Sequence, residues 1–154
     1  MLTLPHTLVA LVIVKFIPDP LIALPSALLS HFLLDFYVIH WNPHLYTEYK
    51  KAGRISSSSL LIILVDTLLA LGFCFYVVNH YWPNLALILV FAGAVFLATL
   101  PDTIEIPYYF FGVKNRWLTR YIKFQHEHQS NGSFYWGLLT QAILVFVCLF
   151  LFFR

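Results

Sequence analysis

The chain has 154 residues, of which 60% are hydrophobic and only 10% are charged. Soluble domains carry roughly 25% charged residues, so this composition excludes a soluble enzyme and a disordered tail. The formal net charge of +2 is too small to indicate a nucleic-acid partner. The sequence therefore predicts one integral membrane domain over residues 1–154.

A helix that spans a membrane needs about 20 mostly apolar residues. The first apolar stretch, residues 4–17, falls short of this length and ends at the turn signal Pro18-Asp19-Pro20. We expect it to span with the help of a tight hairpin, a re-entrant segment being the alternative. Four later stretches are long enough to span: residues 21–39, 58–78, 84–100 and 134–153. The expected fold class is all-α, a polytopic membrane bundle of about five transmembrane segments.

The loops between these segments differ in charge. Lys50, Lys51 and Arg54 lie between the second and third segments, and Lys114, Arg116, Arg120 and Lys123 lie between the fourth and fifth. The connections at residues 18–20 and 79–83 carry no basic residue. By the positive-inside rule both basic loops are cytoplasmic. This places the N-terminus on the cytoplasmic side and the C-terminus outside, in an inner or plasma membrane.

Residues 114–125, in the second basic loop, place Trp117, Tyr121 and Phe124 at helical spacing beside basic side chains. This pattern predicts an amphipathic helix that lies in the headgroup plane and favours anionic lipid. A stop-transfer loop that binds no ligand is the alternative.

Three ionisable residues, His31, Asp35 and Asp66, fall inside the predicted spans, where an Asp costs about 2.5–3.5 kcal/mol. His31 and Asp35 are four residues apart and share one helix face. Counted from the cytoplasmic ends of their helices, all three lie about 6–12 Å deep and can meet. Taken alone, Asp66 is more typical of a hydrogen-bonding partner between helices.

Further ionisable residues are predicted at the same end of the bundle: His6, His40, His44, Asp102, Glu105, His126, Glu127 and His128. Imidazole and carboxylate groups are the ligands of zinc and related divalent ions. Zinc is the expected ion, with manganese or iron as alternatives, at one or two sites. The expected ligands are His6, His31, Asp35, Asp102, His126 and His128. Tandem histidines such as His126 and His128 are also typical of solvated loops.

The segment Ser30-His31-Phe32-Leu33-Leu34-Asp35 resembles the S-H-x-x-x-D helix motif of the YdjM-like family of inner-membrane metal-dependent hydrolases. Leu100-Pro101-Asp102 resembles the family's L-P-D motif, His6 its N-terminal histidine, and residues 126–130 loosely its H-x-x-x-x-H-S motif. In that family the S-H-x-x-x-D helix comes last, whereas here it precedes the L-P-D motif. The stretch from His31 to His44 is also similar to the zinc-ligand helix of zinc-dependent phospholipases C. The resemblance implies metal-dependent hydrolysis.

We therefore expect a membrane-embedded hydrolase that depends on a divalent metal ion. Its expected substrate is a phosphoester or lipid phosphate at the cytoplasmic face, so its expected partner is membrane lipid. Glu127 or Asp66 would transfer the proton. Arg116, Arg120 and Lys123 would hold the substrate phosphate.

Two alternatives come from other functional classes. A non-catalytic membrane adaptor would use its polar residues only as contacts between helices. A haem, ion or proton carrier would use the histidines and carboxylates without hydrolysis. Because about five short segments bury little surface, a homo-oligomer or a larger membrane complex also fits the sequence.

Overall fold

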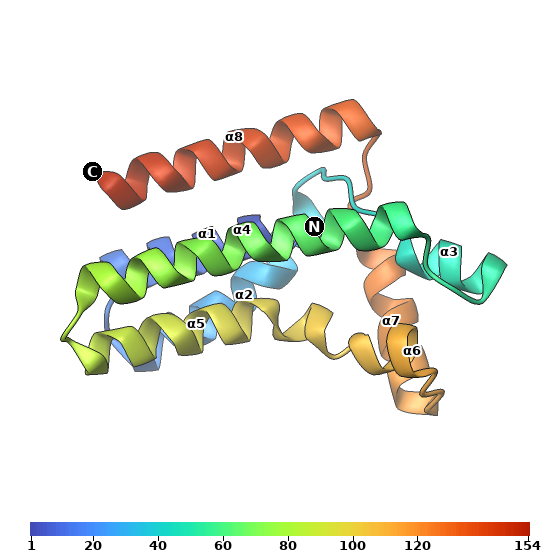
Figure 1. Cartoon of the computed structure of the whole chain (residues 1–154), viewed down its shortest axis with the longest axis horizontal. Coiled ribbons are helices and arrows are strands. Elements are labelled where there is room, and N and C mark those ends of the chain that lie inside the picture. Colours follow the sequence, from blue (N-terminus) through green and yellow to red (C-terminus); the bar gives the residue numbers. More distant parts are fainter.

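The computed structural model describes residues 1–154 and contains eight helices and no strand. It confirms the expected all-α membrane bundle (Figure 1). The helices are α1 (Thr3–Phe16), α2 (Pro20–Tyr37), α3 (Leu45–Ala52), α4 (Ser57–Tyr81), α5 (Leu85–Thr103), α6 (Ile106–Phe111), α7 (Arg116–His128) and α8 (Phe134–Phe153).

Four helices, α2, α4, α5 and α8, are long and apolar enough to cross a membrane. Three of them begin at an N-cap residue whose side chain accepts a hydrogen bond from the first turn. The side chain of Asp19 accepts from Leu21 N at the start of α2, and Ser56 and Asn84 do the same for α4 and α5. These caps satisfy backbone donors that a helix leaves unpaired at its first turn. Sequence and structure therefore agree on an integral membrane protein.

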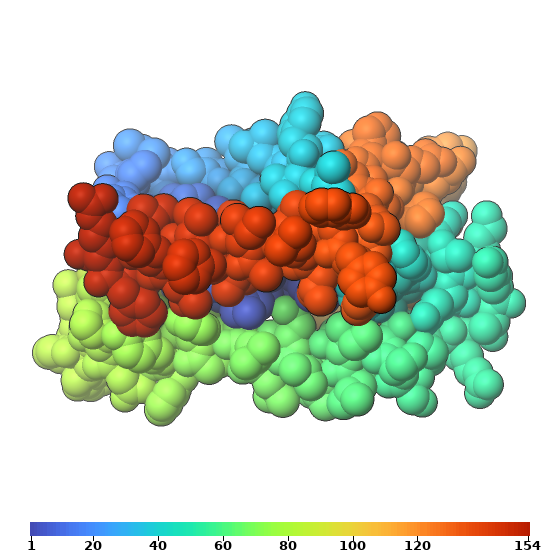
Figure 2. Space-filling model, turned by 90° about the horizontal axis from the view of Figure 1, so that it is seen from above, coloured from blue at the N-terminus to red at the C-terminus, as the bar shows by residue number.

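Helix α1 is the central element of the bundle. Its 14 residues extend about 21 Å, less than the hydrocarbon core of about 30 Å. It packs against α2, α4, α5 and α8, and its Ala10, Leu11 and Val14 are buried. Little of it is visible between α8 and α4 from outside (Figure 2). The first apolar stretch thus forms a shorter helix that is enclosed by the four longer apolar helices.

The two ends of the bundle differ in what they carry (Figure 1). The short connections 17–19 and 82–84 and the C-terminus lie at one end. The N-terminus faces the other end, together with α3, α6 and α7. The two basic loops therefore share one end, which we call the loop end.

Three short helices cover the loop end. The amphipathic helix expected over residues 114–125 is α7, which buries Ile122 and Gln125 and exposes Trp117. Helices α3 and α6 were not expected from the sequence. Each of them ends at a glycine in the left-handed conformation, Gly53 and Gly112, which is the usual residue at this position because it has no Cβ.

Candidate metal centre

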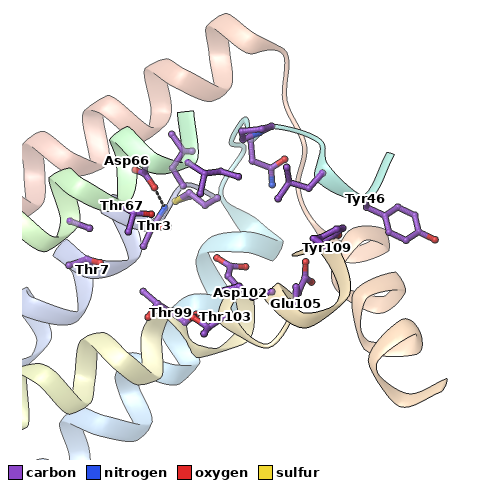
Figure 3. A pocket seen from close by; sticks show the side chains of 18 of the residues that line it. Thr3, Thr7, Tyr46, Asp66, Thr67, Thr99, Asp102, Thr103, Glu105 and Tyr109 are labelled. Carbon is purple, nitrogen blue, oxygen red and sulfur yellow. Dashed lines mark hydrogen bonds between the residues drawn. The ribbon is translucent and has the colours of Figure 1, made fainter. Parts of the chain in front are cut away.

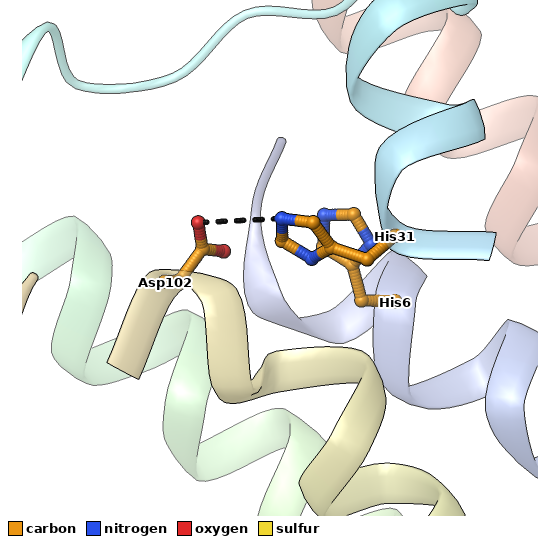
Figure 4. A group of neighbouring side chains, drawn as sticks. All are labelled: His6, His31 and Asp102. Carbon is orange, nitrogen blue, oxygen red and sulfur yellow. Dashed lines mark ion pairs between the residues drawn. The ribbon is translucent and has the colours of Figure 1, made fainter. Parts of the chain in front are cut away.

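His6, His31 and Asp102 meet at the loop end from α1, α2 and α5 (Figure 4). One ligand atom from each lies within 4.8 Å of the others, and the three could hold a metal ion. Both imidazoles are fully buried, while the Asp102 side chain is 37% exposed. The His6 and His31 rings are stacked with their centroids 4.3 Å apart. The structure therefore brings together three of the six predicted ligands as one group.

The His31 ring is oriented by the backbone of α5. Its Nδ1 lies 2.8 Å from the carbonyl oxygen of Ala98, and because a carbonyl only accepts, Nδ1 carries the proton. Nε2 then presents a lone pair, 3.8 Å from Oδ1 of Asp102 and 3.7 Å from Oδ2 of Asp35. A metal-binding histidine is typically held in this way, with its other nitrogen donating to a carbonyl or carboxylate.

Asp35, the fourth predicted ligand, lies between the histidines and is fully buried. Its Oδ1 is 3.2 Å from Nε2 of His6 and accepts a hydrogen bond from the Met1 amine at 2.7 Å. Its Oδ2 accepts from Nε2 of Gln129 at 3.2 Å. The carboxylate thus joins His6 to His31 and places a fully buried negative charge between them.

His40 lies next to this group, although the sequence did not place it among the ligands. It is fully buried, its Nδ1 donates to the carbonyl oxygen of Val38 at 2.8 Å, and its Nε2 lies 3.9 Å from Oδ1 of Asp35. Burial lowers the pKa of His40 to about 4. The motif His40-Trp41-Asn42-Pro43-His44 shows that a histidine follows the helix, but not that the chain folds back over Asp35.

Two chain segments hold His40 in place. Its N–H donates to the carbonyl oxygen of Ser130, and its own carbonyl accepts from Gly132 N at 2.8 Å. The N–H of Ser130 in turn donates to the carbonyl oxygen of Asp35 at 2.8 Å. On the other side the loop packs directly on Gly137 of α8, where a Cβ atom would clash with the backbone of His40 and Trp41.

We expect Gly137→Ala to displace the loop that carries His40 and to weaken metal binding. The new methyl group meets backbone atoms, which cannot move aside as the end of a flexible side chain can. Metal affinity measured by competition with a chelator should fall, and the thermal unfolding temperature in detergent should fall with it. Gly72→Ala in α4 is the matched control, because a Cβ there meets nothing within 4 Å. Equal affinities in the two variants would contradict the role assigned to the loop.

The buried nitrogens of these histidines fit a bound cation. Nδ1 of His6, Nε2 of His31 and Nε2 of His40 are buried and make no hydrogen bond, while Nε2 of His6 lies 3.2 Å from Oδ1 of Asp35. Leaving a polar atom buried and unpaired costs about 1–3 kcal/mol each. Lone-pair nitrogens beside the carboxylates of Asp35 and Asp102 form a donor set suited to a divalent transition metal.

Asp66 has a different environment. It is buried in α4, and its carboxylate accepts from the backbone N–H of Thr3 at 2.6 Å and of Leu4 at 3.2 Å. These donors belong to the first turn of α1, so Asp66, a residue of α4, caps the start of a different helix. The hydrogen bonds give Asp66 a structural role of the kind that an isolated intramembrane Asp most often has.

Replacing Asp66 by alanine should destabilise the fold by about 1–3 kcal/mol, because two buried N–H groups of α1 lose their acceptor. Thermal unfolding in detergent measures this loss. Asp19→Ala removes an N-cap of α2 that is exposed, where water replaces the lost acceptor, so its effect should be smaller. If both variants unfold at the same temperature, the cap on α1 contributes little.

The three predicted residues at the end of α7 lie apart from the centre. His126 is half-buried with its ring beside Tyr46, centroids 4.5 Å apart. His128 is exposed, and its Nδ1 donates to the carbonyl oxygen of Phe124 in its own helix. Glu127 has a 54% exposed side chain and pairs with Lys123 at 3.5 Å. None of these three side chains is part of the His6, His31 and Asp102 group, although His126 lines the cavity that adjoins it.

The three basic residues predicted to hold the substrate phosphate, Arg116, Arg120 and Lys123, are exposed on α7. None of them lines the cavity next to the candidate metal centre. The inner face of α7 has a positioning role instead. Tyr121 donates to the carbonyl oxygen of Pro101 at 3.2 Å, and this contact supports the turn of α5 that carries Asp102.

A cavity of about 360 Å³ adjoins the centre (Figure 3). Asp102 and Glu105 line its polar end together with Tyr109 of α6. Burial, and next the charge of Asp102, raises the pKa of Glu105 to about 8. Asp102 thus belongs both to the buried group and to the cavity wall, and through it the centre is in contact with a space large enough for a small ligand.

Comparison with known proteins finds no relative of this chain. No protein-family model, curated protein or solved structure matches the chain. The site therefore has to be interpreted from its own geometry.

Proposed function

We propose that this protein is a membrane-embedded hydrolase that depends on a divalent metal ion, with zinc the expected ion. The observation that carries the proposal is the group of buried, unpaired imidazole nitrogens of His6, His31 and His40 around two carboxylates. A group used only for packing has no need of so many unpaired nitrogens. The open side of Asp102 towards the cavity supports catalysis over a purely structural metal.

The residues of the centre would have different roles. His6, His31 and Asp102 would hold the ion, with Asp35 and His40 completing the ligand set. A bound divalent ion lowers the pKa of its water to about 7 and polarises the bond to be broken. The carbonyl of Ala98 keeps the His31 ring in one orientation, and α7 keeps Asp102 facing the cavity through Tyr121.

We assign the proton-transfer role to Glu105. It lines the cavity on the side of Asp102, one helical turn along the chain, where it can reach a leaving group. Glu127 lies outside the cavity and is paired with Lys123. Asp66 lines the cavity, but both of its oxygens are engaged by α1.

The proposed substrate is a lipid phosphate. The centre lies near the ends of helices α2 and α5 at the loop end, which would set it close to the headgroup level of a bilayer. A phosphoester there reaches the centre without leaving the membrane. Arg116, Arg120 and Lys123 on the outer face of α7 would then attract anionic headgroups to the surface and not bind the reacting phosphate.

Removal of the metal should abolish the activity. Purified protein dialysed against a chelator should release no inorganic phosphate from phosphatidic acid, and added Zn²⁺ should restore the release because the ion supplies the nucleophile. Phosphate release before and after chelation measures the effect, with Mg²⁺ added alone as the control. Protein that carries a metal yet releases no phosphate from phosphatidic acid with zinc, manganese or iron would refute the proposal.

The geometry disfavours a haem between the two deepest histidines. The rings of His6 and His31 stack 4.3 Å apart at an interplanar angle of 22°. A haem with two histidine ligands needs them on opposite faces of the porphyrin, and these rings leave no room for one.

A further inference from the structure

Beyond the metal-binding candidates, the same cavity is lined by facing side chains of α4 and α5, among them Asp66, Thr67, Thr99 and Thr103, with Thr3 and Thr7 of α1 beside them (Figure 3). On α4 it passes Asp66, Thr67, Ala70, Leu71 and Cys74, and on α5 it passes Thr103, Thr99 and Val95. On α5 these positions are four residues apart, and on α4 they recur every four residues, as the neighbours 66 and 67, the neighbours 70 and 71, and then 74, so each set lies on one face of its helix. We call this space the α4–α5 groove.

The groove extends into the apolar layer of the bundle. From Asp66 to Cys74 and from Thr103 to Val95 the chain advances eight residues, about 12 Å along each helix. Both helices are candidate membrane spans, so the far end of the groove lies at hydrocarbon depth. Its walls become apolar in the same direction, from the threonines near the centre to Ala70, Leu71 and Val95.

The groove is also open at its side. Leu71 lines it and is nevertheless 57% exposed, so this wall is not sealed by the bundle. Ala70, by contrast, is buried and small, and it leaves width at the middle of the groove. A space that is apolar, lies at lipid depth and opens sideways is accessible from the bilayer.

We propose that the α4–α5 groove binds one acyl chain of a membrane phospholipid whose phosphate lies at the metal centre. This inference rests on the proposed function and names how its substrate is recognised. The continuity of the groove with Asp102 and Glu105 supports it, because a headgroup at the centre directs its own chain along the groove. The total cavity volume of about 360 Å³ falls in the range of about 300–1,000 Å³ typical of small-molecule sites.

Photo-crosslinking tests the groove without relying on turnover. The protein is reconstituted in phosphatidylcholine vesicles that contain phosphatidic acid with a diazirine near the end of its acyl chain. Labelled residues are then mapped by mass spectrometry. We expect label at Leu71, Cys74 and Val95, and less of it on the outward-facing Leu69 of the same helix. Label spread over the outer faces alone would overturn the inference.

Variants that fill the groove with a larger side chain provide a matched comparison for the crosslinking. Ala70→Phe should reduce the label at Cys74 and Val95 severalfold, whereas Leu69→Phe, one residue away on a 54% exposed position, should leave it unchanged. Thr99→Leu narrows the groove from the side of α5 with a side chain smaller than phenylalanine, and it should also reduce the label at Cys74 and Val95. Unchanged labelling at Cys74 in Ala70→Phe and Thr99→Leu would contradict a chain bound in the groove.

Metal analysis of the same samples separates the two proposals. Groove labelling in a protein that binds no metal would refute the hydrolase and leave a lipid-binding groove. A metal-loaded, active protein whose groove takes no label would leave the hydrolase and refute the acyl-chain site.

Discussion

Substitution of His31 by alanine should remove the metal ion from the purified protein. His31 supplies an unpaired Nε2 at the middle of the group, 3.7 Å and 3.8 Å from the carboxylates of Asp35 and Asp102. Removing a residue that only hydrogen-bonds to a metal ligand lowers metal affinity by about 10–100-fold. Removing the ligand itself should therefore lower it further. Elemental analysis by plasma mass spectrometry should find near-stoichiometric metal in the wild type and almost none in His31→Ala.

His128→Ala is the matched control for that measurement. His128 is also a histidine at the loop end, but it is exposed and bonded within α7, so its removal should leave the metal content unchanged. A wild-type protein that stays folded and binds no zinc, manganese or iron would exclude the metal centre. The adaptor interpretation would then account for the polar residues.

Asp35→Asn should abolish the proposed hydrolysis while the protein stays folded. The amide has nearly the same shape as the carboxylate, but it lacks the negative charge between His6, His31 and His40. A metal contributes several kcal/mol to transition-state stabilisation, so its misplacement should lower turnover by more than about 100-fold. Phosphate release from phosphatidic acid and thermal unfolding, measured together, distinguish loss of activity from loss of structure.

Asp19→Asn serves as the control, since Asp19 caps α2 at the opposite end of the bundle and asparagine caps helices equally well. An Asp35→Asn protein with wild-type turnover would show that the charge is not needed. Such a result would favour interhelical hydrogen bonding as the role of Asp35.

Much of the fold follows from the sequence because long apolar runs leave few alternatives in a membrane. Residues 134–153 and 84–100 correspond closely to α8 and α5. The position of the first apolar stretch was less predictable. Its composition suits either a span or an enclosed helix, and the choice depends on four other helices packing around it. Helices α3 and α6 are too short to give a periodic hydrophobic signal in the sequence.

The candidate site was predictable where its geometry is local. The four-residue spacing of His31 and Asp35 places them together on any helix, and the alternating direction of the spans brings Asp102 to the same end. His40 depends instead on a loop held by Ser130 and Gly132, residues about ninety positions further along the chain. The positions of His126 and His128 depend on the direction in which α7 leaves the bundle. The spacing of these residues in the sequence does not indicate that direction.

The enclosed position of α1 has a consequence for how the protein is made. A helix of about 21 Å is too short to rest stably in a bilayer by itself, and Asp66 of α4 supplies the acceptors for its first turn. His6 therefore reaches its final place only after α4 and α5 have been inserted. The loop that carries His40 rests on Gly137 of α8 and can be fixed only when the last helix is present. Loading of the proposed metal ion should accordingly be a late step of biogenesis, and ribosome-bound chains that end before α8 should emerge without it.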